Sequence, residues 1–176
     1  MNRLAYFISY PLSITGGRAD SEIRTIAQTL PRHLKPLAEI KANSAAVAIG
    51  SVLAGKEILT RSQENALYQY YLLYLLKRLA HPTGETQDIS SLVQFNHLVE
   101  KNCLIFNLEE RKAGVDVDRA RPAILGLCRS LIALEKTADP KAIETFFQRR
   151  ISGTTILKRI LSFFEFKEPD APSTDR

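Results

Sequence analysis

The most prominent candidates for chemistry in this 176-residue sequence are basic side chains near its C-terminal end. From Arg119 to Arg159 the chain carries nine Lys or Arg and three acidic residues, a net charge of +6 in a chain of +5. Cationic side chains bind phosphates, and such binding weakens steeply as salt is added. We expect an anionic partner, with nucleic acid as one candidate, to bind this segment. The candidate residues are Arg119, Arg121, Arg149, Arg150, Lys158 and Arg159.

The same cations have a simpler interpretation as the solvated faces of helices. The helical segments that contain QRR and LKR must fold back on each other across Gly153 to bring four of the cations together. Phe146 and Phe147 lie close by in sequence, but their spacing fits an inward helix face. They therefore favour core packing over the stacking of bases.

The segment from Gly50 to Glu57, GSVLAGKE, matches the phosphate-binding pattern G-x-x-x-x-G-K. Glu57 occupies the position at which Ser or Thr would hold magnesium, and its charge would repel phosphates. An alanine-rich helix precedes the segment, whereas a phosphate-binding loop follows a strand. We interpret Gly55 as the end of that helix.

Other residues with metal or catalytic potential have weaker patterns. Asp116 and Asp118 could bind a metal, but they are better explained as caps of a helix with Pro122 in its first turn. The histidines at 33, 81 and 97 are far apart and lack the i,i+4 spacing of a zinc helix. His97 is expected at the surface or the edge of the core. We expect no metal, no cofactor and no enzymatic activity.

Apolar residues recur at helical spacing along almost the whole chain, which predicts an all-α fold. We expect a compact bundle of about six or seven helices in a single domain, residues 1–167, followed by a disordered tail at 168–176. Thr60 with Gln63 forms a capping box that begins one helix, and Asp139 before a proline begins another. The best strand candidate is residues 4–8. The two cysteines, in apolar runs, are interpreted as buried and reduced.

The stretch ALYQYYLLYLLKRLA, residues 66–80, is apolar around most of a helix. A helix of this kind must be surrounded, so we interpret it as the central helix of the bundle. Tyr68 is expected to be its exposed tyrosine and a contact for a protein partner. The minority interpretation is a platform for stacking bases, built on Tyr70 or Tyr74.

The last predicted helix carries three phenylalanines, Phe163, Phe164 and Phe166, which cannot all point the same way. Either they pack on the bundle, or some stay exposed and form a protein interface. No segment has the roughly 20 uninterrupted apolar residues that span a bilayer, so we expect a cytoplasmic protein. Attachment to a membrane surface is the weakest of the interpretations.

These observations lead to two functional hypotheses. The first is a non-enzymatic helical interaction subunit or adaptor of a larger assembly, with a protein partner or a second copy of itself. The alternative is a small basic nucleic-acid-binding protein that uses the C-terminal Arg/Lys patch.

Overall fold

The computed structural model describes residues 31–84, 86–107, 109–110, 112–137, 139–151 and 155–163. The predicted strand at residues 4–8, the predicted break at Gly153 and the tail at 168–176 lie outside these residues, as do Phe164 and Phe166. The side chains of Arg159 and Phe163 are likewise outside the description.

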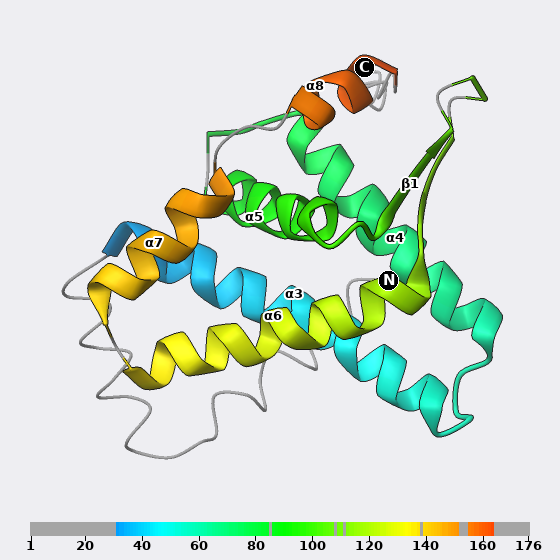
Figure 1. Ribbon diagram of the computed structural model, residues 1–176, viewed down its shortest axis with the longest axis horizontal. Coiled ribbons are helices and arrows are strands. Elements are labelled where there is room, and N and C mark those ends of the chain that lie inside the picture. The colour runs from blue at the N-terminus through cyan, green and yellow to red at the C-terminus, as the bar shows by residue number, and fades with distance from the viewer. Residues whose placement is uncertain are drawn as a thin grey trace, which may run out of the picture.

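Six helices and one β-hairpin account for most of the described residues (Figure 1). In chain order they are α3 (Pro31–Gly55), α4 (Arg61–Ala80), α5 (Thr86–Glu100), β1 (Leu104–Asn107), β2 (Lys112–Val115), α6 (Val117–Thr137), α7 (Pro140–Ile151) and α8 (Thr155–Phe163). The prediction of an all-α bundle is confirmed. The short antiparallel hairpin between α5 and α6, which pairs Leu104 with Val115, is absent from the predicted fold.

Helix α5 lies at the centre of the bundle, in contact with α3, α4, α6 and α7 (Figure 1). It is buried around most of its circumference although it is rich in polar residues. Several of these side chains are hydrogen-bonded within the protein, whereas the buried Ser91 Oγ has no partner among the described residues. The Gln94 Nε2 donates to the Ser90 backbone oxygen at 2.9 Å, and the Gln94 Oε1 accepts from the Tyr71 hydroxyl at 2.9 Å. The Asn96 side chain donates to the Arg150 backbone oxygen.

Helix α4 is not surrounded, so its interpretation as the central helix is wrong. One face is buried against the core, while Tyr70, Leu73 and Tyr74 are exposed on the other. The exposure of Tyr68 is also predicted wrongly: its side chain is fully buried. Its hydroxyl is 2.7 Å from the Ser51 Oγ, a buried hydrogen bond to α3. A phenol can be buried when its oxygen has such a partner.

The glycines of the GSVLAGKE segment have structural roles. Gly50 lies inside α3, where a Cβ would collide with the Leu67 side chain of α4, so glycine permits the close approach of the two helices. Gly55 is the last residue of α3, as predicted. The left-handed residue of the helix end is Glu57, with φ of 60°. The backbone bonds from Glu57 N to Ala54 O and from Ile58 N to Leu53 O form a Schellman motif around it.

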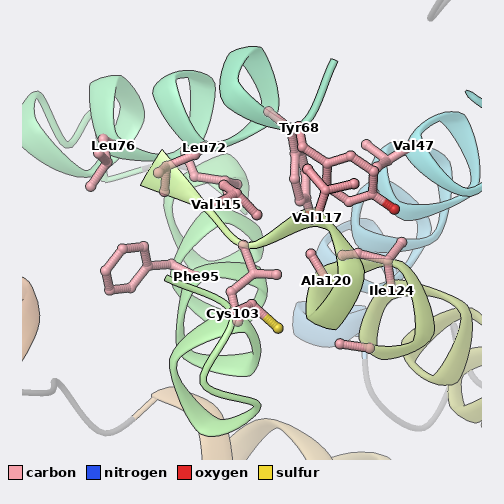
Figure 2. Close-up of a cluster of buried hydrophobic side chains, with 14 of the residues drawn as sticks. Val47, Tyr68, Leu72, Leu76, Phe95, Cys103, Val115, Val117, Ala120 and Ile124 are labelled. Atoms are coloured by element: carbon pink, nitrogen blue, oxygen red, sulfur yellow. The ribbon is translucent and has the colours of Figure 1, made fainter. Parts of the chain in front are cut away.

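Two groups of buried apolar side chains hold the helices together. The larger joins α3, α4, α5, β2, α6 and α8, and Figure 2 shows Tyr68 reaching from α4 towards Val47 of α3 among these residues. The smaller joins α3, α5, α6 and α7 around Phe147. Ile160 of α8 is 2% exposed in the larger group. For this residue the packing interpretation of the last helix is therefore confirmed.

Among the described residues, one helix segment has the length and apolar character to cross a membrane. It is Lys35–Gly55 of α3, with a mean hydropathy of 1.3. A core helix of a soluble protein has the same composition, and α3 contributes Leu37, Ile40 and Val47 to the core. Within the fold 39% of this segment is buried, and the cytoplasmic location stays a prediction.

Candidate functional site

A pocket whose exposed lining is mostly apolar lies where the C-terminal end of α3 meets the first turns of α4 and α6. Its volume is about 230 Å³, and it is lined by Ser51, Ala54, Gly55, Arg61, Glu64 and Arg121. We call this the Glu64 pocket. It combines a hydroxyl, a carboxylate and two guanidinium groups within a largely apolar bundle, and convergent polar groups in a concave site are typical of ligand binding.

The capping box at the start of α4 positions two of these side chains. Thr60 Oγ1 accepts from the Gln63 backbone N–H at 3.2 Å, and Gln63 Oε1 accepts from the Thr60 N–H at 2.8 Å. This reciprocal pair confirms the predicted capping box. It fixes the first turn of α4, so Arg61 and Glu64 lie three residues apart on one face of the helix.

The start of α6 positions Arg121 in a similar way. Asp116 Oδ1 accepts from the backbone N–H groups of Asp118 at 3.1 Å and Arg119 at 3.2 Å. The prediction that Asp116 caps a helix is therefore confirmed. Pro122 lies further inside the helix than predicted, because α6 already begins at Val117.

Glu64 is the central charge of the pocket, and only 1% of its side chain is exposed. Arg121 donates to it in a fork, from Nε to Oε1 at 3.0 Å and from Nη2 to Oε2 at 2.7 Å. Arg61 Nη1 donates to the same Oε2 at 3.2 Å, and its Nη2 to Asp118 Oδ1 at 2.7 Å. The hydrogen bonds from Arg121 lower the pKa of Glu64 despite its burial, so this carboxyl is ionised at neutral pH.

The two arginines differ from Glu64 in that they reach solvent. The side chain of Arg61 is 50% exposed and that of Arg121 is 37% exposed. The pocket lining therefore combines one buried anion with two cations that reach solvent. The two arginines can donate N–H groups to a ligand. The Glu64 carboxylate, in contrast, already accepts hydrogen bonds from both arginines.

A second charged cluster, which we call the Glu100 corner, joins α5 and α7. Arg149 Nη2 is 2.6 Å from Glu100 Oε1, and Arg150 Nη2 is 3.7 Å from Glu100 Oε2. The Arg150 guanidinium also lies over the Phe146 ring, 4.4 Å from its centroid. The arginines of QRR thus have an acidic partner and an aromatic partner within the fold.

The predicted anion-binding arginines of α6 and α7 are not brought together as one patch, and the side chain of Arg159 is outside the description. Arg119 and Arg121 are at the start of α6, and Arg149 and Arg150 are at the far end of α7 (Figure 1). Arg119 is bound to Asp116 at 3.2 Å. Lys158 is exposed on α8. Glu64 is missing from the predicted site, because a glutamate in a helical sequence carries no sign of burial.

Cys103 and His97 are buried in the core, whereas Cys128, also predicted to be buried, is half-buried. Burial raises the pKa of the Cys103 thiol to about 11, which disfavours the nucleophilic thiolate at neutral pH. His97 is 4% exposed, with its Nε2 3.0 Å from the Ala123 backbone oxygen, so its predicted place at the surface or the core edge is wrong. Within the described ranges, no three His, Cys, Asp or Glu side chains gather as metal ligands.

The fold is similar to part of two solved peptidase structures. The structure of DPP III from Caldithrix abyssi matches with a TM-score of 0.70 and 14% identity, over 80% of this chain and 27% of that chain. The structure of dipeptidyl-peptidase III from Corallococcus sp. strain EGB matches with a TM-score of 0.65 and 17% identity, over 74% and 24%. This chain spans about a quarter of either structure. No protein-family model and no curated protein sequence matches it.

These similarities overturn both functional hypotheses drawn from the sequence. The matched structures are peptidases, so the fold is not evidence for a non-enzymatic interaction subunit or adaptor, nor for a basic nucleic-acid-binding protein. The geometry gives a physical reason for the error. Arg119, Arg121 and Arg149 form ion pairs with carboxylates of the same chain, so a count of cations overstates the positive charge they present.

Proposed function

We propose that this chain is a peptide-binding helical domain, related in fold to a part of dipeptidyl-peptidase III, and that it binds peptides in the Glu64 pocket. The observation that carries the proposal is the fold shared with two peptidase structures from two organisms. At 14% and 17% identity the similarity concerns the fold alone, so the choice of site rests on the geometry of this chain.

The pocket is the best place for a peptide because it provides hydrogen-bond donors at a concave surface. Peptides are rich in carbonyl oxygens, and the two arginines present N–H groups at the opening. Glu64 and the helix caps hold these donors in place before a ligand arrives, which reduces the entropy lost on binding. A volume of about 230 Å³ suits the end of a peptide, because sites for whole drug-sized ligands are about 300–1,000 Å³.

Isothermal titration calorimetry with tetra-alanine tests the proposal. This probe has no charged side chains, so binding reports on the backbone and the termini. We expect saturable binding to the wild-type protein. A failure of tetra-alanine to bind at millimolar concentration would contradict the proposal. Mass spectrometry of the same samples for released dipeptide would show whether binding is accompanied by hydrolysis.

Two glycines provide a matched pair of variants for this titration. Gly55 lines the pocket and Gly126 lies in α6 outside it, and a Cβ at either position meets no atom within 4 Å. Gly55→Phe adds a large side chain at the pocket and should weaken binding at least tenfold. Gly126→Phe adds the same group elsewhere and should leave binding unchanged. Equal effects of the two variants would place the peptide outside the Glu64 pocket.

A further inference from the structure

We infer that the Glu64 pocket recognises a carboxylate, and that its ligand group is the C-terminal carboxylate of a short peptide held by Arg61 and Arg121. This inference rests on the proposed function for the nature of the ligand. The recognition of a carboxylate rests on the charges and contacts of the pocket itself.

The first argument is the balance of charge. Two guanidinium groups and one carboxylate line the pocket, so its lining carries a net charge of +1. Asp118, which is outside the lining, pairs with Arg61 at 2.7 Å, and 73% of its side chain is exposed. The first turns of α4 and α6 add partial positive charge from the helix dipoles, and the C-terminal end of α3 adds partial negative charge. The two guanidinium groups of the lining therefore favour an anion over the ammonium group at the other end of a peptide.

A ligand can reach the two arginines of the pocket more readily than its carboxylate. Glu64, the carboxylate of the lining that could bind a peptide ammonium, is buried and accepts hydrogen bonds from both arginines. Arg121 uses Nε and Nη2 in its fork with Glu64, so its Nη1 group is left to donate elsewhere. Arg61 and Arg121 are each more than one third exposed. A carboxylate between these guanidinium groups would gain charge-assisted hydrogen bonds.

The third argument is the role of Glu64. It does not contact the ligand in this arrangement, and we assign it as a positioning residue. Its two oxygens hold the Arg121 fork and one nitrogen of Arg61, which sets the spacing of the remaining donors. The two arginine side chains are therefore ordered before the ligand binds. This lowers the entropic cost of binding.

Calorimetry with two pairs of probes tests the inference at constant ionic strength. The first pair is N-acetylalanine and its methylamide, which differ in the carboxylate and have no free amine. The second pair is tetra-alanine as the free acid and as the C-terminal amide. For both pairs we expect the free acid to bind at least tenfold more tightly than the amide. Arg61→Gln should reduce this preference severalfold, whereas Arg149→Gln at the Glu100 corner should not change it.

The outcomes separate this inference from the proposed function. Equal binding of acid and amide within both pairs would overturn the carboxylate assignment and leave peptide binding intact. Binding of N-acetylalanine but of neither tetra-alanine form would support a carboxylate site and contradict peptide binding. Absence of binding by all four probes would contradict both. An equal preference for the free acid over the amide in Arg61→Gln and in Arg149→Gln would overturn the assigned role of Arg61.

Discussion

The Glu64 pocket and the Glu100 corner contain the same chemical groups, one glutamate between two arginines, in two different environments. Glu64 is 1% exposed and receives a close fork from Arg121, whereas Glu100 is 30% exposed and its contact with Arg150 is 3.7 Å long. The Arg150 guanidinium also lies over the Phe146 ring. Burial therefore turns one cluster into a fixed set of donors, while the other is a partly solvated link between α5 and α7.

The largest expected difference between the two clusters is in stability. Arg121→Met leaves the buried Glu64 charge with Arg61 as its remaining basic partner, and we expect it to lower the free energy of unfolding by about 3 kcal/mol. Urea denaturation measures the change. The double variant Glu64→Met with Arg121→Met removes both charges and should recover most of the loss. A double variant no more stable than Arg121→Met would contradict this account.

A smaller effect is expected for the hydrogen bond behind the pocket. Tyr68→Phe removes one hydrogen-bond partner of the buried Ser51 hydroxyl and should cost about 1 kcal/mol in urea denaturation. Ser51→Ala with Tyr68→Phe removes both groups, and its cost should be smaller than the sum of the two single changes. Additive effects of the two changes would show that the hydrogen bond does not contribute to stability.

The two clusters should also lose stability in different ranges of pH. Burial lowers the pKa of His97, which lies beside the Glu100 corner, below its usual 6.5. The unfolded chain then binds the proton more readily, so stability is lost as the pH falls below about 6.5. The pKa of Glu64 is lowered from 4.5, so its contribution is kept above that pH and lost below it.

Denaturation between pH 7.5 and 5 separates the two groups. His97→Gln can keep a donor for the Ala123 backbone oxygen but cannot titrate. In this variant we expect stability to change little over that range, while the wild-type protein becomes less stable towards pH 5. The same slope in both proteins would show that His97 does not titrate in this range on unfolding.

A small effect is expected at the Glu100 corner itself. Glu100→Gln weakens the contacts of a carboxylate that is 30% exposed with Arg149, which is 67% exposed, and with Arg150, which is 13% exposed. We expect it to lower stability by about 1 kcal/mol, less than Arg121→Met does. High salt should reduce the difference further. A loss as large as that of Arg121→Met, measured in the same denaturant series, would remove the distinction between the two clusters.

The local features of this fold are predicted well from the sequence because they depend on neighbouring residues. The Thr60 capping box and the start of α7 after Asp139 are examples, with Asp139 Oδ1 accepting from the Lys141 N–H at 2.9 Å. The central position of α5, in place of the predicted α4, could not be predicted from neighbouring residues. Apolar composition favours α4 as the central helix, yet α5 is central, and its Gln94 and Asn96 side chains form hydrogen bonds to other helices.

The candidate site was predictable in part for the same reason. Arg121 is recognised as a candidate from its charge, but its partner Glu64 is 57 residues away in the sequence. The pairing depends on how α4 and α6 pack, and helical periodicity does not contain this information. The hairpin was missed because each of its strands has four residues, which is too short for a period-two pattern to stand out.

The most direct test of the account is to find where a peptide binds, by NMR titration of the ¹⁵N-labelled protein with tetra-alanine. The account predicts saturable shifts of the backbone amide signals of Ala54, Arg61, Glu64 and Arg121. The signals of Glu100 and Arg149 should stay in place and serve as the internal control. Shifts confined to the Glu100 corner, or no shifts at saturating peptide, would contradict the claim that the Glu64 pocket binds peptides.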